Sequence, residues 1–175
     1  MGQSPKILLT GPPGCGKTTI IMSIIKKLDR KNASGFYTQE IRQGDIRKGF
    51  SWTRLDGPAG TFAHVDIKGR FKVGKYGVDV AGFEEAIMPV LDTERAGAEL
   101  FIIDEIGKME CLSKEFVAAV KRLFASEKTV LATVAQKGGG LIREVKNYPG
   151  TKLFNLKRDG REKIVDEILE LLSSA

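Results

Sequence analysis

Three glycines, a lysine and a threonine lie close together near the start of the chain. Gly11, Gly16, Lys17 and Thr18 fit the pattern G-x-x-x-x-G-K-[ST], and Gly14 lies between them. In such a loop, backbone N–H groups turn inward around phosphate oxygens, and glycines leave room where a Cβ would block them. The lysine supplies charge for the β- and γ-phosphates, and the threonine hydroxyl can ligate Mg²⁺. The spacing therefore predicts a Walker A phosphate-binding loop.

The residues on either side of this loop favour the same interpretation over an ordinary Gly-Pro turn. Apolar residues at 7–9 predict a buried strand over 6–10, and isoleucines after the loop recur at helical spacing. A helix that begins here directs the positive end of its dipole at a bound anion. We expect every residue of the loop to bind nucleotide: Gly11, Pro12, Pro13, Gly14, Cys15, Gly16, Lys17, Thr18 and Thr19.

A second segment ends in two adjacent carboxylates. Asp104 and Glu105 follow four apolar residues, a run that suits a central parallel strand covered on both faces. An aspartate there can hold Mg²⁺ through water, and a neighbouring glutamate can orient or deprotonate an attacking water. We predict Thr18 and Asp104 as Mg²⁺ ligands, and Lys17 and Glu105 as catalytic residues. The nucleotide-binding residues expected in this segment are Phe101, Ile102, Ile103, Asp104, Glu105, Ile106, Gly107 and Lys108.

Four motifs in order carry a family resemblance that covers nearly the whole chain. They occupy residues 10–19, 35–42, 73–79 and 102–110, and Asp-Glu-Ile-Gly-Lys-Met-Glu in the last is the most specific. On these residues the chain resembles the THEP-type nucleoside-triphosphatase family. The resemblance implies a compact α/β P-loop domain that hydrolyses several nucleoside triphosphates with Mg²⁺.

The apolar pattern of the first half predicts an antiparallel insertion. Strands are expected at 34–42, 47–55 and 61–66, separated by Gly-containing turns, which makes a β-meander after the first helix. The basic, glycine-dotted stretch 67–78 reads as a mobile loop.

Helices and strands alternate through the second half of the chain. A helix bent by Pro89 is expected over 80–97, Ser113 is a candidate N-cap, and 129–134 reads as a further apolar strand. Strands that alternate with helices predict a P-loop NTPase three-layer sandwich of the α/β class, with a mostly parallel sheet. Residues 1–175 are expected to form one domain.

Composition limits the kinds of protein this can be. The chain has 175 residues, a formal net charge of +6, one histidine and two cysteines. These cysteines cannot build a disulfide scaffold and are expected to be free thiols in a reducing cytoplasm. No apolar run approaches the ~20 residues of a membrane span, and a His/Cys zinc site is not favoured. We expect a cytoplasmic monomer whose partners are nucleoside triphosphates rather than a membrane.

Three functional classes fit the motifs. Adjacent carboxylates favour a Mg²⁺-dependent nucleoside-triphosphatase that transfers phosphate to water. A P-loop kinase for a nucleotide or small molecule is the alternative, and the basic loop would be its lid. A nucleotide-gated switch that binds RNA or protein is a third class, because basic residues between 42 and 75 interleave with aromatics. Nucleic-acid binding is the less favoured reading, since a hairpin also buries its aromatics.

Other side chains remain open candidates. No motif reads base identity, so ATP, GTP and other triphosphates are all expected substrates. Thr133, at the end of an apolar strand, is a candidate sensor of the γ-phosphate or a packing residue. The sequence does not choose among the candidates for a charge-stabilising arginine, which are Arg42, Arg70, Arg143, Arg158 and Arg161.

Overall fold

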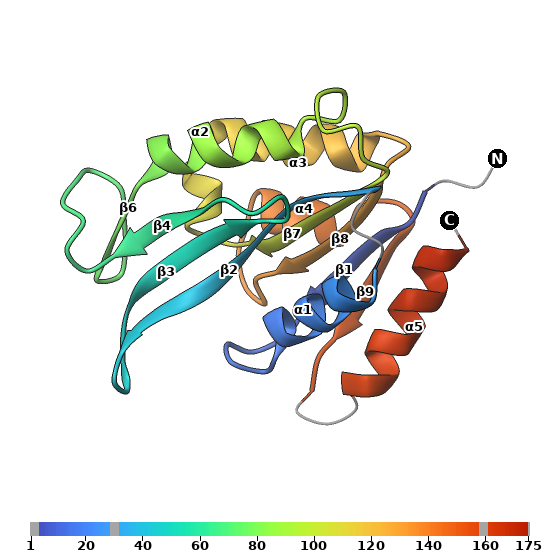
Figure 1. Ribbon diagram of the computed structural model, residues 1–175, viewed down its shortest axis with the longest axis horizontal. Coiled ribbons are helices and arrows are strands. Elements are labelled where there is room, and N and C mark those ends of the chain that lie inside the picture. Colours follow the sequence, from blue (N-terminus) through green and yellow to red (C-terminus); the bar gives the residue numbers. More distant parts are fainter. Residues whose placement is uncertain (1–3, 29–31, 158–160, 175) are drawn as a thin grey trace.

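The computed structural model describes residues 4–28, 32–157 and 161–174, which build one continuous nine-stranded sheet (Figure 1). Its strand order is β5-β6-β4-β3-β2-β7-β8-β1-β9. The strands are β1 (Lys6–Thr10), β2 (Ala33–Gln43), β3 (Ile46–Arg54), β4 (Ala59–His64), β5 (Lys72–Val73), β6 (Tyr76–Val78), β7 (Leu100–Ile106), β8 (Thr129–Val134) and β9 (Thr151–Asn155).

The sheet has a parallel half and an antiparallel half that share β2. Strands β2, β7, β8, β1 and β9 pair in parallel, so their carboxyl ends meet at one edge. Beyond β2 the sheet continues through β3, β4, β6 and β5, and each of these strands is antiparallel to its neighbour. The expected α/β class and the meander after the first helix are confirmed.

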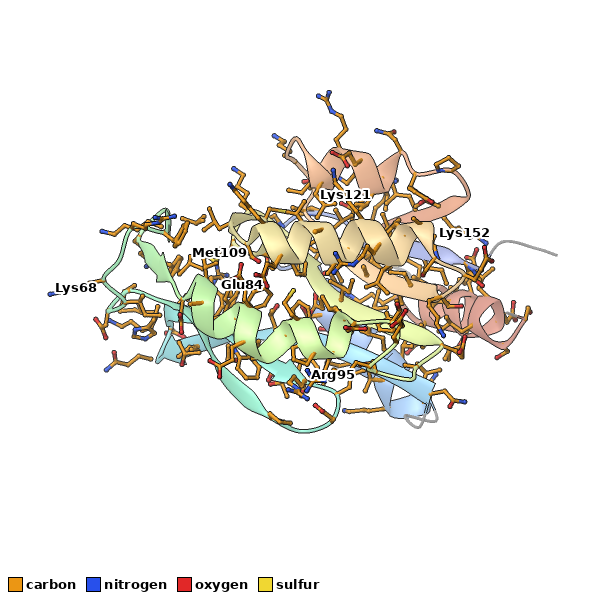
Figure 2. The ribbon with its side chains drawn as sticks, turned by 90° about the horizontal axis from the view of Figure 1, so that it is seen from above. Lys68, Glu84, Arg95, Met109, Lys121 and Lys152 are labelled. Carbon is orange, nitrogen blue, oxygen red and sulfur yellow. The ribbon has the colours of Figure 1, made fainter. Side chains whose placement is uncertain are left out.

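Helices cover both faces of the parallel half and complete three layers (Figure 1). On one face lie α1 (Lys17–Lys27) and α5 (Arg161–Ser173). On the other lie α2 (Val80–Leu91), α3 (Lys114–Ala125) and α4 (Leu141–Lys146). Seen from above, α2 and α3 run side by side across the sheet (Figure 2). Within the described ranges, no helix has both the length and the apolar content that crossing a bilayer requires.

Two apolar cores fill the space between these layers. Phe101 and Ile103 of β7 face α2 and α3, where Phe36 packs edge to face against Phe83 and Phe116. Ile102 faces the opposite core with the isoleucines of α1. Because side chains alternate along a strand, Asp104 follows Ile102 onto the face where α1 lies. The core pattern of β7 thus aims its carboxylate at the loop before α1.

Two expectations for the region between β4 and β7 are wrong. Residues 67–78, expected to be a mobile loop, contain β5 and β6, whose hairpin pairs with β4. The helix expected over 80–97 ends at Leu91, since the Asp92 side chain accepts hydrogen bonds from the backbone N–H groups of Glu94 and Arg95. This Asx-type turn competes with continued helix. Ser113 does cap α3, because its hydroxyl accepts from the Phe116 N–H at 2.9 Å.

Gly35 permits the close approach of β2 to β7. It lies opposite Ile102 in the parallel register with a φ of +124°. A Cβ at this position would lie 1.9 Å from the Ile102 carbonyl oxygen. Only glycine tolerates both this φ and this contact. Asp104 is two residues further along β7, so the same approach determines where β2 meets the carboxylate.

Replacing Gly35 by alanine is expected to destabilise the protein by about 2 kcal/mol or more, because the new Cβ must displace a strand backbone. Urea unfolding would measure this loss. Gly69→Ala is the matched control, since a Cβ there meets no atom within 4 Å and Gly69 has no positive φ. Equal stability of the two variants would contradict the close-approach account.

Candidate functional site

The loop before α1 leaves its backbone donors available at the carboxyl edge of the sheet. Pro12, Pro13 and Gly14 are exposed, whereas Cys15 is buried in the core below α1. Gly16 precedes the helix with a φ of +100°, and no side-chain cap bonds the helix start among the described residues. The first N–H groups of α1 therefore keep the capacity to bind an anion.

Asp104 is the most heavily hydrogen-bonded carboxylate of this edge. It is 1% exposed, yet three donors reach it. The Thr18 hydroxyl donates to Oδ2 at 2.8 Å, and the Thr133 hydroxyl donates to Oδ1 at 2.6 Å. The Thr38 backbone N–H donates to Oδ2 at 3.4 Å. Burial raises the pKa of Asp104, and the hydrogen bonds from Thr133 and Thr18 oppose that rise. The network joins β7 to α1, β8 and β2.

Glu105 lies beside Lys17 and is open to the solvent side of the site. The Lys17 ammonium is 4.0 Å from Glu105 Oε2 and donates to the Gly11 carbonyl at 3.2 Å. Burial raises the pKa of Glu105, the Lys17 charge lowers it, and the Asp104 charge raises it further. The Glu105 side chain is 33% exposed, compared with the closed surroundings of Asp104. The two adjacent carboxylates thus have different access to water.

A third carboxylate stands behind Glu105. Glu110 is buried at the start of a short 3-10 helix (Glu110–Leu112), where burial and the Glu105 charge raise its pKa to about 8. A Cβ on Gly107 would lie 2.8 Å from Glu105 Oε1 and 2.9 Å from Glu110 Oε2, so both side chains approach this backbone. Glu110 was not among the predicted site residues. Its only sequence signal is its place at the end of the Asp-Glu-Ile-Gly-Lys-Met-Glu string.

A cleft of about 860 Å³ opens over the loop and Glu105. The predicted residues that line it are Gly11, Pro13, Gly14, Gly16, Lys17, Thr18, Thr19 and Glu105. Phe101, Ile102, Ile103 and Ile106 are fully buried in the apolar cores and support the strand from below. Lys108 is exposed beyond the strand, and neither it nor Gly107, Pro12, Cys15 or Asp104 lines the cleft among the described residues.

Two further segments complete the cleft. The β2–β3 hairpin contributes Thr38, Gln39, Glu40, Arg47 and Phe50. The loop after β8 contributes Ala135, Gln136 and Lys137. Thr38, Gln39 and Glu40 belong to the motif at 35–42. No motif marks Arg47 or Phe50, because their proximity to the site depends on the return of the meander to the carboxyl edge.

The arginine candidates take different positions. Arg42 pairs with Glu40, the Arg70 guanidinium lies over the Phe71 ring, Arg143 is exposed on α4, and the Arg161 guanidinium packs beside Gly16. In the part of the chain that the structure describes, none of these four lines the cleft. Arg158 lies outside the described residues.

The oxygen donors around Asp104 fit a hard divalent cation. Within the described ranges, no group of three or more His, Cys, Asp or Glu side chains forms an all-protein metal cage. Mg²⁺ in phosphate sites needs no such cage, since one or two protein oxygens, water and substrate phosphates complete its octahedron. The Thr18 hydroxyl and the Asp104 carboxylate, 2.8 Å apart, supply such oxygens beside the loop.

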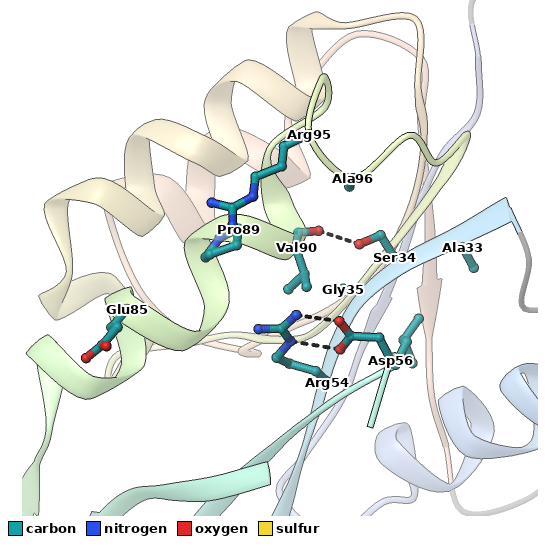
Figure 3. A pocket seen from close by; sticks show the side chains of 11 residues that line it. Ala33, Ser34, Gly35, Arg54, Asp56, Glu85, Pro89, Val90, Arg95 and Ala96 are labelled. Atoms are coloured by element: carbon teal, nitrogen blue, oxygen red, sulfur yellow. Dashed lines mark hydrogen bonds and ion pairs between the residues drawn. The ribbon is translucent and has the colours of Figure 1, made fainter. Parts of the chain in front are cut away.

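A second cleft of about 480 Å³ lies where β2 begins, near the amino end of the parallel strands (Figure 3). Several of its polar groups bond to neighbouring elements. Arg54 forms a fork with Asp56, and Ser34 donates to the Val90 carbonyl (Figure 3). Arg54 also donates to the Ala86 carbonyl. These contacts join α2 to β2 and β3. We therefore assign this cleft a role in fastening the layers, away from the carboxyl edge where α/β sheets bind ligands.

The buried Glu110 predicts a pH-dependent stability. Its folded-state pKa of about 8 exceeds the ordinary value of 4.5, so between these values the folded protein binds more protons than the unfolded chain. Stability should therefore fall as pH rises through this window, by at most about 1.4 kcal/mol per pH unit. Glu110→Gln should flatten the decline in urea unfolding without Mg²⁺ or nucleotide. Glu115→Gln, at an exposed site on α3, should leave the decline intact; an unchanged slope in the Glu110 variant would refute the assignment.

Comparison with known proteins places this geometry in a family. A family model described as NTPase matches residues 6–169. Nucleoside-triphosphatase THEP1 of Thermotoga maritima is 42% identical over 169 residues, which cover 95% of each chain. Cancer-related nucleoside-triphosphatase of Homo sapiens is 35% identical over 184 residues, which cover 97% of each chain.

A solved structure shares the same fold. The crystal structure of THEP1 from the hyperthermophile Aquifex aeolicus superposes with a TM-score of 0.88 at 36% identity, over 95% of this chain and 98% of the other. The sequence matches and the shared fold both extend over nearly the whole chain, including the phosphate loop and the Asp104–Glu105 strand. This chain belongs to the THEP1 nucleoside-triphosphatase family.

Proposed function

We propose that this protein is a Mg²⁺-dependent nucleoside-triphosphatase that converts ATP, GTP and other triphosphates to the diphosphate and phosphate. The observation that carries the proposal is the shared placement of Lys17, Thr18 and Glu105 in one cleft, with Asp104 hydrogen-bonded to Thr18 directly below. The names of the relatives support hydrolysis of triphosphates as the reaction.

In the proposed complex the phosphates lie along the loop. Backbone N–H groups of residues 14–18 donate to their oxygens, because Pro12 and Pro13 have no N–H. Lys17 exchanges its contact with the Gly11 carbonyl for the β- and γ-phosphates. Bound Mg²⁺ would be held by Thr18 and, through water, by Asp104, and it would neutralise charge on the β- and γ-phosphates. Thr133 keeps the Asp104 carboxylate oriented by donating to its other oxygen.

Glu105 is the proposed general base. Its carboxylate is next to Lys17 and partly open to water, so it can accept a proton from a water that attacks the γ-phosphorus. The water oxygen forms a bond to phosphorus while the bond to the β–γ bridging oxygen breaks, and the electron pair leaves with the diphosphate. Glu110 lies behind Glu105, and its burial favours the protonated form.

The cleft also bears on specificity and on the kinase alternative. Its proposed contacts address phosphate and Mg²⁺, and no residue is assigned to a base edge, which supports broad base tolerance. A kinase needs an acceptor pocket and a closing lid. The stretch considered as that lid, 67–78, instead carries β5 and β6. The pairing of this stretch into strands supports water as the phosphate acceptor. Nucleic-acid binding remains the less favoured activity.

The proposal also covers the domain organisation, cellular location and oligomeric state of the protein. One sheet runs through the chain, which supports 1–175 acting as one domain. Cys15 and Cys111 are free thiols, consistent with the reducing cytoplasm that we infer as its location. We propose that it acts as a monomer.

Glu105→Gln should lower kcat by ~10²–10⁴-fold, the usual range for a positioned general base, because an amide cannot accept the water proton. Affinity for a fluorescent triphosphate analogue should remain, since Lys17 and the loop are intact. Steady-state phosphate release and a binding titration would measure the two effects. Glu94→Gln, at an exposed site, is the control; normal turnover by the Glu105 variant would move the base elsewhere.

Hydrolysis should proceed with Mg²⁺ and triphosphate alone. ATP, GTP, CTP and UTP should give kcat/KM values within roughly tenfold, about 1.4 kcal/mol of discrimination. Phosphate release would be measured alone and again with pooled nucleosides, nucleoside monophosphates and small metabolites. If phosphate release without an acceptor is negligible and one acceptor is phosphorylated rapidly, the protein is a kinase and not a hydrolase.

A further inference from the structure

The hairpin wall of the cleft carries an arginine to which the proposed function gives no role. Arg47 lies near the start of β3 and lines the same cleft as Lys17 and Glu105. The β2–β3 strands and the loop before α1 come together at the carboxyl edge of the sheet, although they are separate in sequence (Figure 1). A cation therefore stands across the cleft from the phosphate loop.

The surroundings of Arg47 hold its guanidinium without using all its donors. Its Nη2 pairs with Glu40, and its Cζ lies 5.4 Å from the centre of the Phe50 ring. Its Nε is buried and has no hydrogen-bond partner among the described residues. A guanidinium presents five N–H donors in a rigid fork suited to phosphate. Glu40 engages only part of this fork, which leaves the other Nη group to face a ligand in the cleft.

Glu40 is shared by two arginines of the hairpin and holds Arg47 at the cleft wall. Arg42 Nη1 contacts Glu40 Oε2 at 2.7 Å, while Arg47 contacts Oε1. Burial acts to raise the pKa of Glu40, but Arg42 and Arg47 lower it overall, so the carboxylate stays charged. Arg42 does not line the cleft among the described residues.

The charged side chains that line the cleft indicate what Arg47 would bind. Glu105 and Glu40 bring negative charge to the cleft, and Lys17 and Lys137 bring positive charge. In phosphoryl transfer, charge is spread over the γ-phosphoryl oxygens and the leaving oxygen, and an arginine that contacts them is worth ~10³–10⁵ in kcat. Lys17 can neutralise part of this phosphate charge from the side of the loop. A second cation can then act from the side of the hairpin.

We propose that Arg47 is the charge-stabilising arginine of this site, supplied by the same chain, and that it donates to the γ-phosphoryl group as its bond to the bridging oxygen breaks. This inference rests on the proposed triphosphate hydrolysis. Arg47 forms no covalent bond and transfers no proton. Glu105 accepts the proton of the attacking water, and the diphosphate takes the electron pair. Phe50 and Glu40 position the guanidinium at the cleft.

Steady-state kinetics separate this role from a structural one. Arg47→Ala should lower kcat by ~10²-fold or more and leave KM within about threefold, because the contact strengthens in the transition state. Arg47→Lys should recover little of the loss, since an ammonium cannot make the forked contact. Added guanidinium ion at low millimolar concentration should partly rescue Arg47→Ala and leave Glu105→Gln unrescued. Arg42→Ala, which also removes a partner of Glu40, should keep kcat within about threefold of the original protein.

A binding measurement tests Arg47 independently of turnover. Aluminium fluoride with ADP and Mg²⁺ mimics a transferring γ-phosphoryl group. The original protein and Arg42→Ala should bind ADP more tightly when aluminium fluoride is added, whereas Arg47→Ala should bind ADP alone normally and lose this gain. Thermal denaturation would verify that each variant is folded.

Two results would overturn the inference. One is an Arg47→Ala protein that keeps both its kcat and the aluminium-fluoride gain. The other is an equal loss in Arg47→Ala and Arg42→Ala, which would indicate a general effect of the Glu40 pair. Failure of the proposed hydrolysis has a different signature, because the unsubstituted protein itself would then release no phosphate without an acceptor.

Discussion

The buried Asp104 carboxylate is the interaction on which the rest of the site depends. A carboxylate that is 1% exposed must have its lost hydration replaced, or it protonates or destabilises the fold by several kcal/mol. Thr18, Thr133 and the Thr38 N–H replace that hydration from three different elements. The carboxylate therefore couples the positions of α1, β8 and β2. A shift of β8 would leave Oδ1 without its donor, and a shift of α1 or β2 would remove one of the two donors to Oδ2.

The backbone N–H groups where the phosphate loop enters α1 remain available because, in the part of the chain that the structure describes, no acidic or capping side chain binds them. The first turn of α1 has no acidic residue, and no side-chain cap occupies its N–H groups among the described residues. Below the loop, Cys15 is packed into the core, and its sulfur stands 2.7 Å from where a Cβ on Gly11 would lie. The loop is thus anchored from beneath while its upper surface presents unsatisfied donors. In the proposed complex, phosphate oxygens would accept from these donors and take the place of a side-chain cap.

The meander links the stability of the fold to the chemistry of the cleft. On the helix side, Phe36 of β2 and Phe62 of β4 pack against Phe83 of α2, so the antiparallel strands help to build the core. At the carboxyl end of β2, the same strands carry Thr38, Glu40 and Arg47 to the cleft. Aromatic burial on one part of the meander therefore holds its polar end in place over the phosphate loop.

The sequence by itself determined the elements whose chemistry is local. The loop at 11–18 is recognisable because the spacing of its glycines, lysine and threonine is what a phosphate-binding loop requires. The four apolar residues before Asp104 identify a strand that is covered on both faces. Local patterning also located the meander and the Ser113 cap. It failed at 67–78, where two short strands exist only because β4 offers an edge to pair with, and after Leu91, where the Asp92 turn ends the helix.

Only the tertiary structure decided which distant residues share the cleft. Thr38, Arg47 and Phe50 reach the site through the close approach of β2 to β7 at Gly35 and through the strand register of the meander. The arginines that the sequence analysis named as charge-stabilising candidates did not include Arg47. Folding brought Arg47 to the cleft. The physical reason is that motif spacing records contacts within one segment, whereas strand pairing and burial bring together residues that no local pattern connects.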